Sequence, residues 1–158
     1  MKISNQGIEL IKKFEGCKLT AYRDSVGIPT IGIGHTRGVK MGMKITLQQA
    51  ADFLRDDLAY CEKTLNGIGV VFTQNEYDAL CSWVFNLGVG SFTKSTMYKR
   101  IVARADKESI TDEMVKWVFA GGRSLLGLKR RRVEEANMYL GRALYYIDAN
   151  NNIRKRDE

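Results

Sequence analysis

The sequence predicts an α+β protein that is mainly helical, with one small antiparallel sheet near its N-terminus. Apolar residues recur at helical spacing through most of the chain. Only residues 19–36 depart from this spacing, with two strand-like segments on either side of a turn. The length of 158 residues fits a single domain, 1–158. Within it we expect a small sheet lobe over about residues 16–45 and a larger helical lobe over about 46–147, which also includes the N-terminal helix.

The first element is a short helix that ends at Glu15. Ser4 is a typical N-cap residue, and Gly16 is a typical C-terminal stop. Apolar residues recur between them about one helical turn apart, at Ile8, Ile11 and Phe14. A carboxyl group therefore stands at the end of this helix, where the sheet segment begins.

The sheet segment follows directly. Residues 20–23 and 28–33 have the composition of strands, and residues 24–27, Asp-Ser-Val-Gly, have that of a turn. We therefore expect two or three short strands, with Asp24 in the turn.

Two capping boxes begin the longest predicted helices. Thr46 with Gln49 begins a helix that runs to about Leu65, and Thr73 with Glu76 begins a helix that ends near residues 88–90. The apolar stripe of the first helix is Leu47, Ala51, Leu54, Leu58, Cys61 and Leu65, and that of the second is Tyr77, Leu80, Cys81, Val84 and Phe85.

Three further helices are predicted over about residues 94–104, 111–119 and 127–145. In the last of them, Arg130/Glu134 and Arg131/Glu135 are charge pairs four residues apart. We expect the basic run 129–132 to form a solvent-exposed, salt-bridged face. One of its arginines is also a possible partner for Glu15.

The composition excludes several classes of protein. Apolar residues make up 44% of the chain, and no segment reaches the roughly 18 uninterrupted apolar residues of a membrane-spanning helix. The first residues lack the apolar core of an export signal. Three cysteines without paired spacing argue against a disulfide scaffold, and a single histidine argues against a zinc site. The net charge of +7, most of it after residue 93, favours an anionic partner such as nucleic acid, a membrane surface or a cell-wall polymer.

Glu15, Asp24 and Thr30 are the candidate catalytic residues. The end of a helix dipole and neighbouring apolar side chains both favour the protonated form of Glu15. Asp24, in a polar turn, is expected to stay ionised. Two carboxyl groups that differ in this way suit acid–base cleavage of a glycosidic bond, and the Thr30 hydroxyl can hold a water molecule. Glu15 and Asp24 also fit a surface charge and a turn former.

These residues resemble the catalytic region of the phage-type lysozymes, the muramidases that tailed bacteriophages use as endolysins. Eight residues separate Glu15 from Asp24, five separate Asp24 from Thr30, and residues 30–36 read Thr-Ile-Gly-Ile-Gly-His-Thr. The resemblance continues in order through residues 46–50, 54, 57–58, 74–80, 85–92, 117, 121–122, 127–128, 131–132 and 135. It implies a lysozyme-like fold with an active-site cleft between the two lobes.

The resemblance also implies a role for each candidate. The residue that matches Glu15 is the general acid, the one that matches Asp24 activates or supports the attacking water, and the one that matches Thr30 helps to hold that water. The substrate is the glycan strand of peptidoglycan, and the cleft is expected to be lined by Gly34, His35, Phe85 and Asn86. These four residues equally fit packing or capping roles, and His35 fits a structural, hydrogen-bonded histidine.

The implied reaction is hydrolysis of the β-1,4 bond between N-acetylmuramic acid and N-acetylglucosamine, with no metal or other cofactor. The family favours inversion at the anomeric carbon. Members of the family accumulate in the host cytoplasm and reach the periplasm and cell wall through a lesion made by a separate holin. We expect a monomer with no nucleic-acid partner and no stable membrane insertion.

Three other functions stay open. A lytic transglycosylase would cleave the same bond with one acid and no water, although Asp24 and Thr30 argue against it. A cysteine amidase or peptidase would use Cys17 and His35, but no basic helix start lies near Cys17 to activate its thiol. A nucleic-acid-binding module would use residues 129–132, which lack interleaved aromatic residues.

Overall fold

The computed structural model describes residues 1–156, so residues 157–158 of the predicted domain and tail lie outside the described residues. The helices are α1 (Asn5–Glu15), α2 (Leu47–Asn66), α3 (Gln74–Leu87), α4 (Val89–Lys94), α5 (Thr96–Val102), α6 (Lys107–Met114) and α7 (Leu126–Leu140). The strands are β1 (Lys18–Arg23), β2 (Pro29–Gly32), β3 (Phe119–Ala120), β4 (Arg123–Ser124), β5 (Tyr145–Ile147) and β6 (Ile153–Lys155). They pair as three antiparallel hairpins, β1–β2, β3–β4 and β5–β6. The predicted class, mainly helical α+β, is confirmed.

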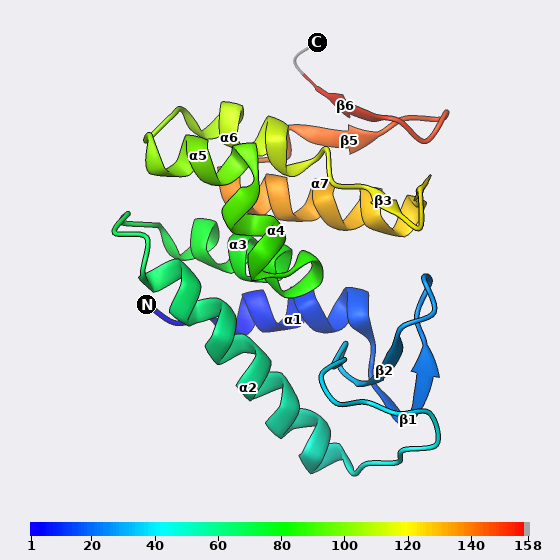
Figure 1. The fold of residues 1–158 in the computed structure, drawn as a ribbon. Coiled ribbons are helices and arrows are strands. Elements are labelled where there is room, and N and C mark those ends of the chain that lie inside the picture. The colour runs from blue at the N-terminus through cyan, green and yellow to red at the C-terminus, as the bar shows by residue number, and fades with distance from the viewer. Residues whose placement is uncertain (157–158) are drawn as a thin grey trace.

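The hairpin β1–β2 lies at one end of a helical body, as Figure 1 shows. The C-terminal end of α1 and the N-terminal end of α2 both lie at this hairpin, while their other ends lie against the helical body. These two helices therefore connect the small sheet to the body. α3 packs against α1, α2 and α7, which places it at the centre of the fold.

α1 begins and ends where the sequence predicts. The Ser4 hydroxyl oxygen accepts a hydrogen bond from the Gly7 backbone N–H. The same hydroxyl donates to Asp78 of α3, which ties the start of α1 to the helical body. Gly16 ends the helix with a φ of 67°, a positive value that glycine adopts without steric cost. Glu15 is therefore the last helical residue.

Both predicted capping boxes are present, at Thr46 with Gln49 in α2 and at Thr73 with Glu76 in α3. The predicted end of the second helix needs a small correction. α3 ends at Leu87 with Gly88 as its cap, because Gly88 has a φ of 94°, whereas Gly90 lies inside α4.

The middle of the chain corrects the prediction for residues 111–119. α6 begins at Lys107, because the Asp106 side chain accepts a hydrogen bond from Ser109 N–H and so caps the helix earlier than expected. Residues 119–124 form the unpredicted hairpin β3–β4, whose turn is Gly121–Gly122, both with positive φ. The predicted helix over 94–104 is divided between the end of α4 and α5 by the N-cap Ser95.

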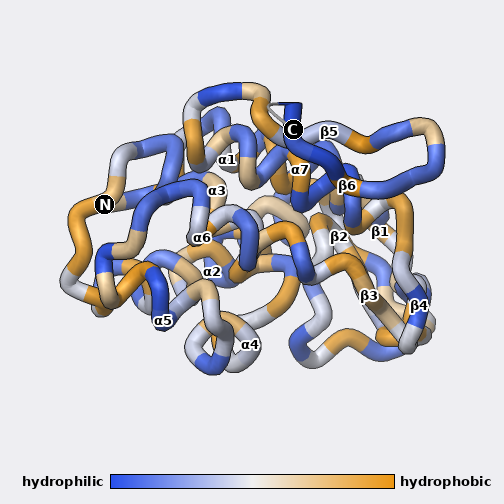
Figure 2. Tube along the Cα trace, turned by 90° about the horizontal axis from the view of Figure 1, so that it is seen from above, coloured by the Kyte–Doolittle hydropathy of each residue, from blue (hydrophilic) through white to orange (hydrophobic). Residues whose placement is uncertain are grey.

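α7 ends at Leu140, five residues before the predicted end. Gly141 adopts a left-handed conformation with a φ of 70° and stops the helix. Tyr145 lies instead in β5, which pairs with β6 to form a C-terminal hairpin. Figure 2 shows that β6 and the turn before it are mostly hydrophilic.

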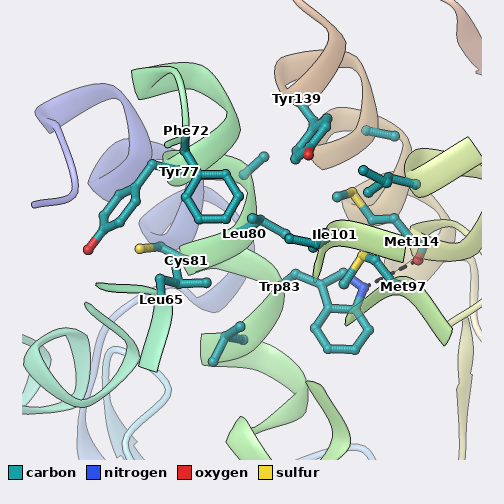
Figure 3. Close-up of a cluster of buried hydrophobic side chains, with 14 of the residues drawn as sticks. Leu65, Phe72, Tyr77, Leu80, Cys81, Trp83, Met97, Ile101, Met114 and Tyr139 are labelled. Carbon is teal, nitrogen blue, oxygen red and sulfur yellow. Dashed lines mark hydrogen bonds between the residues drawn. The ribbon is translucent and has the colours of Figure 1, made fainter. Parts of the chain in front are cut away.

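The main core surrounds α3, as Figure 3 shows. Trp83 is fully buried, and its indole N–H donates to the Met114 carbonyl oxygen over 3.3 Å. A smaller cluster of Ile11, Ile33, Leu54 and Leu58 packs α1 against α2 and the segment after β2. This smaller cluster fixes the end of α1 relative to the sheet.

The cysteines are free thiols, with Cys61 and Cys81 buried as predicted and Cys17 exposed. Among the helices of residues 1–156, none combines the length and the hydropathy that a membrane crossing needs.

Candidate active site

Glu15 lies in contact with a residue from the far end of the chain. Its Oε2 atom is 2.6 Å from Nη1 of Arg131 in α7, and its side chain is 18% exposed. The sequence suggested one arginine of the run 129–132 as a partner for Glu15, and Arg131 is that arginine. This charge-assisted hydrogen bond joins the end of α1 to α7.

Gly34 forms a wall of the Glu15 site. A Cβ atom at position 34 would lie 2.7 Å from Glu15 Oε1, closer than such contacts allow. The φ of Gly34 is +65°, which also favours glycine. The sequence therefore places glycine here for two reasons, backbone conformation and the close approach of the carboxylate.

Asp24 lies in the turn between β1 and β2, as predicted. Its Oδ1 atom accepts hydrogen bonds from Val26 N–H at 3.0 Å and from Ile28 N–H at 2.8 Å. Asp24 is therefore a turn former, and it directs only one carboxylate oxygen into the turn.

Tyr22 links the surroundings of Glu15 and Asp24. Burial raises the pKa of the Tyr22 phenol, and the negative charges of Glu15 and of Asp24 raise this pKa further. Both carboxylates therefore lie within electrostatic reach of one phenol in β1.

Thr30 lies opposite Tyr22 in the register of β1 and β2. It is 3% exposed, and its hydroxyl donates to the Ile28 carbonyl oxygen over 2.8 Å. The hydroxyl proton is thus committed to the backbone, which leaves the oxygen as an acceptor.

Gly34 and Phe85, two of the four expected cleft residues, line the same hollow of about 200 Å³ between the segment after β2, α2 and α3. The other two make specific contacts. His35 Nδ1 lies 2.8 Å from Asp57 Oδ2, and its ring stacks on Phe53 with centroids 4.2 Å apart. His35 is therefore hydrogen-bonded, as expected.

Asn86 is held from the core side. Its Oδ1 atom accepts a hydrogen bond from Nη2 of Arg132 over 2.5 Å. Arg132 is fully buried, and burial lowers its pKa while the neighbouring Glu135 raises it.

The prediction of a solvent-exposed basic face on α7 is wrong for Arg131, Arg132 and Glu135, because these side chains are 3%, 0% and 0% exposed. They share a stripe of the helix with two other buried residues, Ala136 and Tyr139. This stripe is the sequence signal that could have predicted the burial of these charged residues. Its members recur at helical spacing once charged residues are counted as possible core residues.

Cys17 lines a hollow that His35 does not line. This apolar hollow, of about 930 Å³, lies between α1 and α2, and Ile8, Ile33, Leu54 and Leu58 also line it. Glu15, Asp24 and Thr30 do not line this hollow, and neither does His35.

The comparisons with known proteins agree on one family. The phage lysozyme family model matches residues 12–135. An endolysin of Acyrthosiphon pisum secondary endosymbiont phage 1 is 44% identical over 142 residues, which cover 86% of this chain and 97% of that relative.

Two solved structures have the same fold. An endolysin from Escherichia coli O157:H7 phage FAHEc1 is 42% identical, with a TM-score of 0.77, over 89% of this chain and 94% of that chain. The muramidase domain of SpmX from Asticaccaulis excentricus is 34% identical, with a TM-score of 0.77, over 88% of this chain and 97% of that domain. The chain therefore belongs to the phage lysozyme family.

Proposed function

We propose that this lysozyme is an endolysin that hydrolyses the β-1,4 bond between N-acetylmuramic acid and N-acetylglucosamine in peptidoglycan, with Glu15 as general acid. The observation that supports the proposal is the pairing of Glu15 with Arg131 at the end of α1, together with the raised pKa of the Tyr22 phenol, to which the charges of Glu15 and of Asp24 both contribute. Two carboxyl groups in different surroundings are the usual machinery of glycoside hydrolysis.

Glu15 protonates the glycosidic oxygen as positive charge develops at the anomeric carbon. The carboxylate that remains is negative. Arg131 Nη1, 2.6 Å away, stabilises this charge as it forms. The Arg131 charge therefore promotes transfer of the Glu15 proton to the glycosidic oxygen in the transition state.

Asp24 and Thr30 hold the attacking water, and the Asp24 carboxylate takes up the proton that this water loses as its oxygen bonds to the anomeric carbon. Asp24 Oδ1 is engaged in the turn, while its Oδ2 makes no hydrogen bond with the described part of the protein and can accept one from water. The Thr30 oxygen can accept the other water proton, because its own proton goes to Ile28. Water delivered to the face opposite the leaving oxygen inverts the anomeric carbon.

The glycan strand lies along Gly34, His35, Phe85 and Asn86 in this proposal. The hollow that contains Gly34 and Phe85 supports it, because this hollow adjoins Glu15 through Gly34. Neither the bond nor the residues call for a metal or another cofactor.

The proposed route to the wall follows the family pattern. The chain accumulates as a monomer in the host cytoplasm and reaches the periplasm and cell wall through a separate holin. The net charge of +7 favours retention on an anionic wall, and this retention weakens as salt is added.

The mass of the digestion products tests the proposed reaction. A lysozyme leaves reducing N-acetylmuramic acid ends that have gained water, whereas a lytic transglycosylase leaves 1,6-anhydro ends. Mass spectrometry of purified peptidoglycan after digestion is expected to show reducing ends. Anhydro ends alone would assign the chain to the transglycosylase reaction instead.

A further inference from the structure

Behind the Glu15–Arg131 ion pair lies a buried polar network, and the proposed reaction uses only Arg131 of its members. It joins Ser82 of α3 with Arg131, Arg132 and Glu135 of α7, and each of these residues is 3% exposed or less. Glu15 stands at the edge of this network, between it and the cleft.

Three nitrogen atoms of Arg131 are held in three directions. Nη1 meets Glu15 Oε2 at 2.6 Å, Nη2 donates to the Ser82 carbonyl oxygen at 3.1 Å, and Nε meets Glu135 Oε2 at 3.3 Å. A guanidinium group is planar, so these contacts fix its orientation as a unit. Nη1 points at Glu15 because the other two nitrogens are held elsewhere.

The Ser82 hydroxyl connects the two partners behind Arg131. It donates to Glu135 Oε2 over 2.5 Å, and it lies 3.3 Å and 3.4 Å from Nη2 and Nε of Arg131 as their acceptor. Glu135 Oε1 lies 2.8 Å from Arg132 Nε, so Glu135 is shared between two arginines. The Ser82 hydroxyl supplies one of the hydrogen bonds that the Glu135 carboxylate needs. Glu135 therefore draws less strongly on Arg131, and the interaction of Arg131 with Glu15 is stronger.

The charges of the network sum to zero only when the negative charge of an ionised Glu15 is included. Arg131 and Arg132 carry two positive charges, and Glu135 carries one negative charge. Buried charges are costly unless they are paired. Any change in how Glu135 shares the arginines therefore alters the stability of the Glu15 charge.

We propose that Ser82 and Glu135 are positioning residues for Glu15, acting through the orientation of Arg131. They touch neither the substrate nor the reacting atoms. The inference rests on the proposed role of Glu15 as general acid. In this role Glu15 must keep its proton, so the strength of its contact with Arg131 sets the pH above which activity falls.

Other groups also face Glu15. They are the Tyr22 phenol of β1 and, behind Arg131, the Arg132 guanidinium of α7. The segment after β2 contributes Gly34, which carries no charge, followed by His35 on Asp57. Variants at Ser82 change none of these groups, so a shift between variant and parent reports on the network.

The first test is Ser82→Ala, with Ser95→Ala as a matched control. Ser95 is also a buried serine, but its hydroxyl caps α5 away from the network. Peptidoglycan hydrolysis is measured as a function of pH, and the Glu15 carboxyl is titrated by ¹³C NMR in the same variants, with Glu15→Gln used to assign its signal.

We expect Ser82→Ala to shift the fall of hydrolytic activity at alkaline pH to higher pH, by about half a unit or more. The titration of the Glu15 carboxyl in this variant is expected to shift in the same direction. Without its hydroxyl donor, Glu135 draws Arg131 away from Glu15, so Glu15 keeps its proton longer. Ser82→Thr retains the hydroxyl and is expected to restore the parent profile. Ser95→Ala is expected to lower thermal stability without moving the profile.

Glu135→Gln gives a second test with the opposite sign. Without the negative charge of Glu135, the positive charges of Arg131 and Arg132 both stabilise the Glu15 carboxylate. Hydrolytic activity is therefore expected to fall at a lower pH than in the parent. If Glu135→Gln fails to fold, the Ser82→Ala variant is the deciding test.

A pH profile of Ser82→Ala that matches the profile of Ser95→Ala, while Glu15→Gln stays inactive, overturns the inference and leaves the proposed function intact. An active Glu15→Gln variant overturns the proposed function itself.

Discussion

Glu15 and Arg131 are 116 residues apart in the chain, and their side chains meet at 2.6 Å between Oε2 and Nη1. This contact joins the end of α1 to α7. Glu15 and its partner therefore come from opposite ends of the sequence, while the hairpin β1–β2 carries the other two candidate residues, Asp24 and Thr30.

Glu15→Gln is expected to reduce peptidoglycan hydrolysis by about 10²-fold or more, because general acid catalysis contributes about 10²–10⁴-fold. Glutamine can still accept a hydrogen bond from Arg131, so the thermal midpoint is expected to change little. Glu9→Gln is the matched control, since Glu9 is an exposed glutamate of the same helix. Equal activity in the two variants would remove Glu15 from the mechanism.

Asp24→Asn separates the two roles of Asp24. The asparagine oxygen can still accept from Val26 and Ile28 N–H, so the turn is expected to persist. The carboxylate charge is lost, and hydrolysis is expected to fall by about 10²-fold or more. Asp56→Asn on the exposed face of α2 serves as control. A fully active Asp24→Asn variant with an intact turn, checked by NMR, would leave Asp24 as a turn former alone.

Gly34→Ala is expected to disturb the Glu15 carboxylate, because the new Cβ atom would lie 2.7 Å from Oε1. Gly38→Ala is the matched control: its φ of +70° is similar, but no atom lies within 4 Å of the added Cβ. Both substitutions are expected to lower the free energy of unfolding by about 1 kcal/mol through backbone strain. Only Gly34→Ala is expected to lose most activity as well, and equal activities would contradict the close approach of Gly34 to Glu15.

The thiols are expected to differ in reactivity at pH 8. Burial, with the charges of Asp57 and Glu62, raises the pKa of Cys61 to about 12, so its reactive thiolate is scarce until the pH approaches that value. Burial likewise raises the pKa of Cys81. A small methylthiolating reagent is therefore expected to modify only the exposed Cys17 in the folded chain, and all three thiols in denaturant, as counted by mass spectrometry.

The modified, folded chain is expected to keep its hydrolytic activity, because Cys17 faces the hollow between α1 and α2. Loss of activity on methylthiolation of Cys17 alone, with the fold intact, would revive the cysteine amidase or peptidase alternative.

The N-terminal part of the site was predictable because its signals are local. Ser4 and Gly16 set the ends of α1, and the composition of residues 24–27 set the turn that contains Asp24. These features depend on backbone conformation within a few residues, which the sequence displays directly.

The network behind Glu15 was not predictable in the same way. Charge pairs four residues apart look alike on an exposed and on a buried helix face, and only the packing of α7 on α3 buries Arg131 and Glu135. Ser82 gave no signal either, since its role depends on residues about fifty positions away.

The configuration of the first product tests most directly whether Asp24 and Thr30 present water across from Glu15. Proton NMR during digestion of a soluble glycan strand from peptidoglycan records which anomer of the new reducing end forms before mutarotation. We predict that the α-anomer appears first, as inversion of a β-1,4 bond requires. Initial appearance of the β-anomer would show retention, and it would contradict a direct attack by the water that Asp24 and Thr30 hold.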